Sequence, residues 1–142
     1  MKNKVLFVCI NNTGRSQIAA VLFNKYALSD WRAESAGTAD ITEFTMRERA
    51  AVKPAAQLLI DVVKEVEGID ISEYPRRKMT EEMLPEYAKI IIMAEKETLP
   101  EYLRNYDYTY WDIPDFVSKD RAGFYESLEV VRSHVYTLVA EL

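Results

Sequence analysis

The sequence predicts an α/β fold in which a parallel sheet is covered by helices on both faces. Two continuous apolar runs, Val5-Leu6-Phe7-Val8 and Ile90-Ile91-Ile92, are rich in β-branched residues, as is typical of strands buried on both sides. Segments with apolar residues at helical spacing alternate with these runs. Because strands that alternate with helices form parallel sheets, the two observations together indicate the fold class.

The N-terminal half contains two predicted strands and one clear helix. The run at 5–8 is the first strand, and a short second strand is expected near 31–35. Residues 38–53 are charged and weakly periodic, so we expect a loop with some helix there. Residues 16–26 are expected to be helical, with an apolar stripe made of Ile18, Ala19, Leu22, Phe23 and Tyr26.

A second long helix is expected between Pro54 and Gly68. Proline suits the first position of a helix, and glycine suits its C-terminal cap. The predicted inward face consists of Ala55, Leu58, Leu59, Val62, Val63 and Val66.

The C-terminal half supplies two more strands and a closing helix. The third strand is expected at 89–93 and the last at 108–111, with a helical segment at 95–104 between them. Residues 121–142 form the closing helix, whose apolar side consists of Phe124, Leu128, Val131, Val135, Leu138 and Leu142.

Composition narrows the class of protein. The 142 residues are 49% hydrophobic, which suffices for one core, so residues 1–142 are expected to form a single domain. The formal net charge of −5 argues against a nucleic-acid partner. No apolar run approaches the ~20 residues that cross a bilayer, and the N-terminus lacks a signal-peptide pattern. We therefore expect a cytoplasmic protein with no membrane partner.

The chain has one cysteine, Cys9, and one histidine, His134. A single cysteine forms no internal disulfide, and one Cys with one His is a poor set of metal ligands, so no metal site is expected. A functional Cys9 is therefore a lone reactive thiol. The alternative is a buried structural thiol, which is the commoner fate of a single cysteine.

The segment from Cys9 to Ser16 lies between the first predicted strand and the first predicted helix. Ligands of parallel sheets bind beyond the carboxyl ends of strands, and a helix N-terminus directs several backbone N–H groups toward one point. Asparagine and glycine tolerate the positive φ angles of a tight concave loop. The sequence therefore predicts an oxyanion site formed by Ile10, Asn11, Asn12, Thr13, Gly14 and Arg15.

Three side chains of this loop have complementary chemistry. The thiolate of Cys9 is favoured by the helix N-terminus and by a nearby guanidinium. Arg15 offers a planar fork that matches two oxygens of a tetrahedral oxyanion, and the Ser16 hydroxyl can donate to the sulfur. A nucleotide-binding P-loop is excluded here because the Gly-Lys-Ser/Thr ending is missing. The remaining alternative is a purely structural turn.

A thiolate displacement needs an acid for the leaving oxygen. Residues 111–116 supply two carboxylates, Asp112 and Asp115, just after the last predicted strand. The alternative for each is an aspartate that caps a turn. The basic cluster at 75–78 is a further candidate that could attract an anionic substrate, although a solvated basic turn is the favoured interpretation.

These residues resemble the low-molecular-weight protein tyrosine phosphatases and the arsenate reductases that share their fold. The resemblance covers nearly the whole chain, and its motifs are the strand and loop through Ser16, Glu34-Ser35-Ala36-Gly37-Thr38, Gly68-Ile69-Asp70-Ile71-Ser72, Arg77-Lys78-Met79-Thr80, the strand at 90–93 and the segment at 111–115. It implies a four-stranded parallel sheet in the order 2-1-3-4, with neither a metal nor an organic cofactor.

The resemblance also implies a role for each matching residue. The family's nucleophilic cysteine falls on Cys9, its phosphate-binding arginine on Arg15, its thiolate-stabilising serine on Ser16 and its loop-bracing asparagine on Asn12. Its general acid falls on Asp115 rather than on Asp112.

Several positions depart from the phosphatase pattern. Asn11 and Gly14 replace a glycine and a second cysteine, which makes the loop more similar to that of the arsenate reductases. Many of those enzymes carry further cysteines that resolve the arsenic–sulfur adduct, and this chain has none; some carry them where this chain has residues 93–96. Phe116 replaces the usual proline, and Val117 stands in place of an aromatic wall, which argues against phosphotyrosine selectivity.

Three functions remain open from the sequence. The first is a phosphatase that hydrolyses phosphomonoesters, from a phosphoprotein or a small molecule, through a cysteinyl-phosphate on Cys9; a single cysteine suffices for that cycle. The second is an arsenate reductase in which an external thiol or redoxin completes the reduction. The third is a non-catalytic oxyanion- or phosphoprotein-binding module or a cysteine phosphocarrier, against which Arg15 and Asp115 argue.

Overall fold

A four-stranded parallel sheet forms the centre of the molecule. The computed structural model describes residues 3–28, 30–114 and 120–142. Strands β1 (Lys4–Cys9), β2 (Arg32–Gly37), β3 (Lys89–Ile92) and β4 (Thr109–Tyr110) are arranged in the order β2-β1-β3-β4, with every neighbouring pair parallel. The α/β fold and the strand order expected from the sequence are therefore confirmed.

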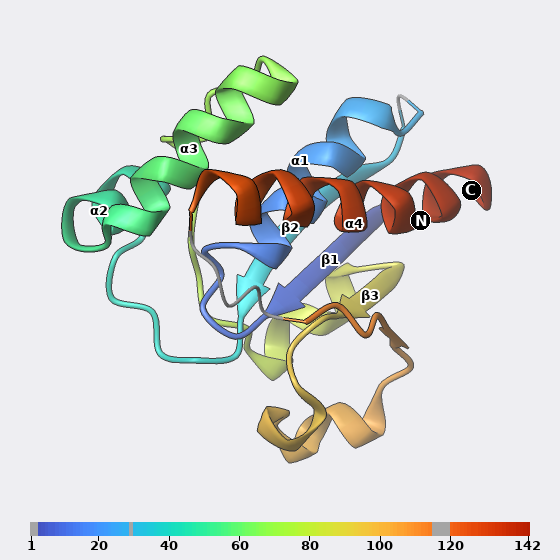
Figure 1. Ribbon diagram of the computed structural model, residues 1–142. Helices are drawn as coiled ribbons and strands as arrows, with labels where there is room; N and C mark the ends of the chain where they lie inside the picture. The colour runs from blue at the N-terminus through green and yellow to red at the C-terminus, as the bar shows by residue number, and fades with distance from the viewer. Residues whose placement is uncertain (1–2, 29, 115–119) are drawn as a thin grey trace.

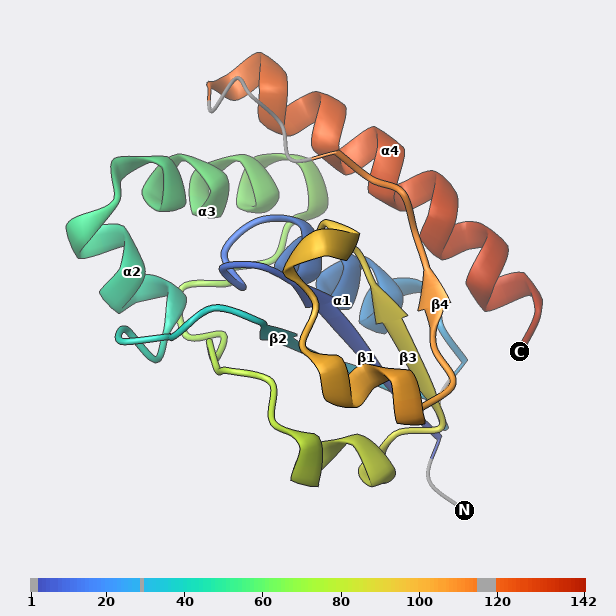
Figure 2. The same ribbon diagram turned by 90° about the horizontal axis from the view of Figure 1, so that it is seen from below.

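The two faces of the sheet are covered by different kinds of helix. Helices α1 (Arg15–Tyr26), α3 (Pro54–Glu67) and α4 (Arg121–Ala140) pack on one face, and Figures 1 and 2 show them together on that side. The short 3-10 helices η1 (Glu81–Glu86) and η3 (Glu101–Asn105) supply the cover of the opposite face.

Alternation along β1 separates the two cores. Val5 and Phe7 are fully buried against the α-helical layer, while Leu6 and Val8 are fully buried on the other face. Both sides of this strand are apolar because both faces of a parallel sheet are covered. Cys9, the last residue of β1, therefore lies at the carboxyl end of a central strand that is packed on both faces.

Two sequence expectations differ from the structure. The segment at 95–104 is not one helix but two 3-10 turns, η2 (Lys96–Thr98) and η3, separated by Leu99 and Pro100. Proline has no backbone N–H, so a continuous helix cannot run through this point. On α3 the buried face includes Ile60, whereas Val66 is 41% exposed, so the face is rotated relative to the predicted stripe.

The connection from β2 to α3 contains a short helix, α2 (Met46–Val52). Thr45 caps it by accepting a hydrogen bond from the backbone N–H of Glu48 (3.1 Å), and the Glu48 carboxylate accepts from the N–H of Phe44 (3.0 Å). This reciprocal pair orients the start of the helix. Helix α2 then leads directly into α3, so both lie beside the loop that follows β1 (Figure 2). No helix among the described ranges is long and apolar enough to span a membrane.

A buried carboxylate connects the three helices of the first face. Glu67, whose side chain is 2% exposed, forms ion pairs with Lys25 on α1 (2.8 Å) and with Arg132 on α4. Burial alone would raise the pKa of this carboxyl, but the hydrogen bonds from Lys25 and Arg132 outweigh it and hold the pKa below its usual value. Glu67 therefore contributes stability in its ionised form.

We expect Glu67→Gln to lower the free energy of unfolding at pH 7 by about 3 kcal/mol, because two cations lose their buried partner. Since the folded-state pKa of Glu67 is depressed, its contribution is present above the unfolded pKa of about 4.3 and is lost as the pH falls through the lower folded value. Urea unfolding at pH 7 and in acid measures both effects.

A matched control on the same helix, α3, is Glu65→Gln, which removes an exposed ion pair with Arg121 of α4. That change is expected to cost less than about 1 kcal/mol. Equal losses from the two variants, or a Glu67→Gln loss that persists unchanged into acid, would contradict the assignment of Glu67 as the buried connector.

Candidate active site

The loop between β1 and α1 forms a concave site at the carboxyl edge of the sheet. Cys9 is the last residue of β1, and Arg15 is the first residue of α1. Gly14 occupies the N-cap position, and no side chain caps the helix. The first N–H groups of α1 therefore remain available to an anion.

A cavity of about 180 Å³ opens above this loop. One wall is the loop itself, contributed by Cys9, Ile10, Asn11, Thr13, Gly14 and Arg15. The facing wall belongs to α2, α3 and α4 and consists of Arg49, Lys53, Ala55, Ala56, Leu59 and Phe124. Five of the six residues predicted to form the oxyanion site thus line one cavity with Cys9, and the sixth, Asn12, is buried behind them.

The sulfur of Cys9 is reached by a chain of two hydrogen bonds. The Asn12 side-chain amide donates to Ser16 Oγ (2.7 Å), and Ser16 Oγ lies 3.0 Å from Cys9 Sγ. Because Ser16 Oγ already accepts from Asn12, its own hydrogen is free to point at the sulfur. The Ser16 hydroxyl can therefore serve as a hydrogen-bond donor to the Cys9 sulfur.

The backbone at Asn12 adopts a left-handed conformation, with φ of 51°. Asn12 is fully buried, and its Oδ1 accepts from the N–H of Arg77 (3.0 Å). Gly37 lies directly behind it: a Cβ there would meet the carbonyl oxygen of Ile10 at 2.5 Å. Glycine at the end of β2 is therefore required for the close approach of the loop to its neighbouring strand.

Arg15 is held in place by groups from the ends of β3 and β4. Its Nη1 donates to the carbonyl oxygens of Met93 (2.7 Å) and Ile113 (2.9 Å), and its Nη2 pairs with the Glu95 carboxylate at 3.2 Å. The side chain is 5% exposed. None of the described residues accepts a bond from Nε, which leaves this donor for a ligand in the cavity that Arg15 lines.

A second arginine, Arg76, supports the loop from outside. Its guanidinium donates from Nη2 to the carbonyl oxygen of Asn11 (2.6 Å) and from Nε to that of Asn12 (3.3 Å). Its side chain is 2% exposed, so the expectation of a solvated basic turn at 75–78 is wrong for this residue. The pKa of Arg76 is lowered, first by burial and then by the nearby positive charge of Arg49. Glu43 and Cys9 act in the opposite direction and raise it, but they do not outweigh these two causes.

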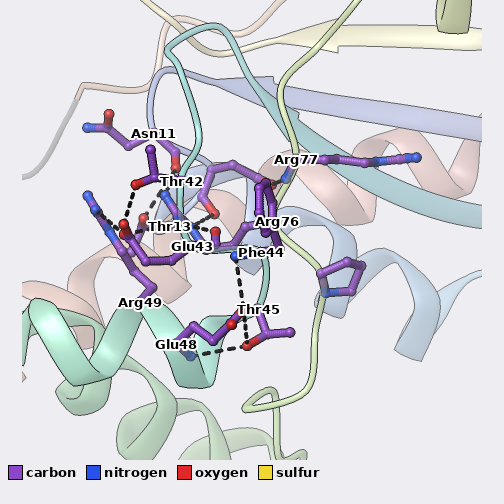
Figure 3. Close-up of polar contacts among 12 residues, drawn as sticks. Asn11, Thr13, Thr42, Glu43, Phe44, Thr45, Glu48, Arg49, Arg76 and Arg77 are labelled. Atoms are coloured by element: carbon purple, nitrogen blue, oxygen red, sulfur yellow. Dashed lines mark hydrogen bonds and ion pairs between the residues drawn. The ribbon is translucent and has the colours of Figure 1, made fainter.

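These bonds determine which way the peptide groups of the loop face. A peptide N–H points opposite to the carbonyl oxygen of the same peptide group. With the carbonyls of Asn11 and Asn12 held outward by Arg76, the amides of Asn12 and Thr13 face the concave side. Figure 3 shows Arg76 close to Glu43, with the loop residues Asn11 and Thr13 nearby.

Of the two candidate acids, Asp112 lies within the described residues. Asp115 lies outside the described residues. Asp112 is exposed and does not line the cavity. The segment that precedes Asp115 contacts the loop through the Ile113 carbonyl, which accepts from Arg15.

Comparison with known proteins places the chain in a family. Residues 4–142 match the model of the low molecular weight phosphotyrosine protein phosphatase family. The chain belongs to this family. The resemblance inferred from the motifs is thereby confirmed over almost the full sequence, and the phosphatase and arsenate-reductase alternatives both have solved relatives.

Three solved structures illustrate the range of activities among the relatives. The low molecular weight protein tyrosine phosphatase from T. tengcongensis is 27% identical, with a TM-score of 0.74 over 98% of this chain and 99% of that chain. An arsenate reductase from Archaeoglobus fulgidus is 30% identical, with a TM-score of 0.70 over 96% and 98% of the two chains. A thioredoxin-dependent arsenate reductase from Corynebacterium glutamicum is 25% identical, with a TM-score of 0.67, and the match covers 95% of this chain and 59% of that chain.

Two functional neighbours were missed by the sequence reasoning. Glu95 pairs with Arg15, and its position just beyond the carboxyl end of β3 was a usable signal, since that edge carries the site. Arg76 gave no such signal, because a buried arginine and a solvated one look alike in a single sequence. Its burial depends on packing against the loop 65 residues earlier.

We expect Arg76→Ala to weaken the binding of inorganic phosphate by roughly tenfold or more, because two loop carbonyls lose a charged donor and the amide cradle loosens. Isothermal titration calorimetry measures the affinity directly. Lys78→Ala is the control: Lys78 is exposed and bonds to Asp40, so phosphate affinity should stay within about twofold. Equal weakening by both variants would contradict the role of Arg76.

Proposed function

We propose that this chain is a phosphatase that hydrolyses phosphomonoesters through a covalent intermediate on Cys9. The observation that carries the proposal is the 3.0 Å approach of Ser16 Oγ to Cys9 Sγ, beside a cavity of about 180 Å³ that Cys9 lines together with the loop. Family membership supports the same chemistry. The chain has one cysteine, and this reaction requires no second thiol.

In the first step, the Cys9 thiolate attacks phosphorus as the bond to the leaving oxygen breaks. The loop amides and the Arg15 guanidinium stabilise the charge on the equatorial oxygens. Asp115 donates a proton to the leaving oxygen, as the family resemblance implies. The contact of Ile113 with Arg15 supports this assignment, since it brings the segment before Asp115 to the loop.

In the second step, Asp115 takes a proton from water as the water oxygen attacks phosphorus. The phosphorus–sulfur bond breaks, inorganic phosphate leaves and Cys9 returns to the thiolate. Ser16 donates to the departing sulfur, which stabilises this leaving group. The proposed roles are thus nucleophile for Cys9, oxyanion ligand for Arg15, thiolate donor for Ser16 and acid–base for Asp115.

An arsenate reductase is the second candidate, and it is favoured by the 30% identity to the Archaeoglobus fulgidus enzyme. Arsenate has the tetrahedral shape that the loop would hold. The segment at 93–96 contacts Arg15 through Met93 and Glu95 but contains no thiol. An arsenic–sulfur adduct on Cys9 would therefore need an external thiol or redoxin to complete the reduction.

We expect Cys9→Ser to abolish hydrolysis of an aryl phosphate, and Asp115→Asn to lower kcat by about 10²- to 10³-fold. Asp112→Asn is the matched control and should leave kcat within about twofold, since Asp112 is exposed and away from the cavity. Steady-state kinetics with para-nitrophenyl phosphate measure all three. Retained activity in Cys9→Ser would show that the mechanism is wrong.

The same preparation separates the two candidate reactions. In the proposed phosphatase, water and not an added thiol completes the reaction on Cys9, so we expect hydrolysis of aryl phosphate and no arsenite above background when arsenate is supplied with glutathione, or with thioredoxin and its reductase. Arsenite is measured by ion chromatography. Steady arsenite formation without hydrolysis of aryl phosphate would assign the site to arsenate reduction instead.

A further inference from the structure

The wall of the cavity that faces the phosphate loop is positively charged. Arg49 on α2 and Lys53 at the start of α3 both line it, although the protein as a whole has a formal charge of −5. A tetrahedral oxyanion in the loop would direct its leaving oxygen away from Cys9, toward this wall. Arg49 and Lys53 therefore lie on the side that receives the leaving group.

Arg49 is held in position by a carboxylate that it shares. Its Nη1 donates to Glu43 Oε1 at 2.8 Å, and Arg76 Nη1 lies 3.5 Å from the same oxygen. Figure 3 shows Glu43 between the two arginines, with Arg49 rising from α2 beside Asn11. The Arg49 side chain is 19% exposed, so a fixed guanidinium, and not a mobile surface chain, borders the cavity.

This wall has more positive than negative charge. Hydrogen bonds from Thr42 and Arg49 lower the pKa of Glu43, so its carboxylate is ionised and supplies one negative charge. It faces two guanidiniums, Arg49 and Arg76. Arg49 Nε is buried without an acceptor among the described residues, and Lys53 has no ion pair within them. One carboxylate is thus shared by two guanidiniums and Lys53 has no ion pair among the described residues, so a net positive charge remains on the side of the leaving group.

Lys53 lies where two helices meet. It is the C-cap residue of α2 and the N-cap residue of α3, and its side chain makes no capping hydrogen bond at α3. A cation is favourable at a helix C-terminus and unfavourable at an N-terminus, so its two effects on helix stability oppose each other. The ammonium group therefore remains available to a ligand in the cavity that Lys53 lines.

We propose that Arg49 and Lys53 select phosphomonoesters whose leaving group carries a second anionic group, a carboxylate or a phosphate. The inference rests on the proposed phosphatase activity and names its substrate class. The rest of the wall is apolar, with Leu59 and Phe124, so the carbon frame of the leaving group packs there while its anion reaches the cations. Free arsenate has no such group, and the wall would be of no use in its reduction.

The test compares two substrates that differ in one charge. 3-Carboxyphenyl phosphate and 3-carbamoylphenyl phosphate have similar shapes, and the ratio of their kcat/KM values measures selectivity. The intrinsic reactivity of each ester cancels when this ratio is compared between wild type and variants. We expect Lys53→Gln to lower the ratio about threefold and Arg49→Gln to lower it about fivefold or more. The effect of Arg49 is larger because its side chain is mostly buried, whereas Lys53 is exposed and its charge is screened by water.

Two controls separate binding from folding. Lys64→Gln removes an exposed lysine from α3 that does not line the cavity, and it should leave both rates and the ratio unchanged. Lys53→Gln should change the free energy of unfolding little, because its charge stands at both the C-terminus of α2 and the N-terminus of α3, where its effects oppose each other. Arg49→Lys keeps the charge and should retain part of the selectivity.

A second arm identifies the source of the anion. Phosphotyrosyl peptides with Glu or Gln beside the phosphorylated residue are compared in the same way. A larger Glu-to-Gln ratio than the ratio for the aryl esters indicates an acidic phosphoprotein, and a smaller ratio indicates a small substrate.

Equal losses of kcat/KM on charged and neutral esters in the variants would show general attraction of phosphate and overturn the inference, while leaving the phosphatase activity intact. Absence of hydrolysis of any ester by the wild type would overturn both.

Discussion

The site depends on one constraint: the left-handed turn at Asn12 must be held so that the carbonyl oxygens of the loop face Arg76 and its amide N–H groups face the concave side. Asn12 has a φ of 51° and is fully buried, a conformation that costs free energy unless surrounding bonds repay it. Arg76 and the Arg77 N–H bind its oxygens, and its amide donates to Ser16. The same contacts that stabilise the turn also aim the Ser16 hydroxyl at the sulfur. Structure and chemistry are therefore coupled at this residue.

Three arginines around the loop share two carboxylates, and Lys53 has no ion pair among the described residues. Arg15 is balanced by Glu95, and Arg76 shares Glu43 with Arg49. A buried guanidinium with a partner is oriented without being neutralised, so it can still attract an oxyanion. This arrangement separates binding of the phosphoryl group, which belongs to the loop, from recognition of the leaving group, which belongs to α2 and the start of α3.

The family resemblance and the departures from it have the same physical origin. The proposed chemistry needs a nucleophilic sulfur, an amide cradle and a guanidinium, and Cys9, the loop and Arg15 would supply them. It does not need a second thiol when water completes the reaction, which is consistent with the single cysteine of this chain.

Local patterns were enough to predict the parallel sheet and the junction of the first strand and first helix that carries Cys9, Arg15 and Ser16, because apolar runs and a strand–loop–helix unit are local features. The family resemblance supplied the strand order, and Asp115 stays a prediction. The packing of distant elements was needed to show that Arg76 is buried under the loop, that Glu95 holds Arg15, and that Arg49 and Lys53 line the cavity with Cys9. These partners lie tens of residues apart, and burial, which decides whether a charged side chain is solvated or structural, is created only when distant elements pack together.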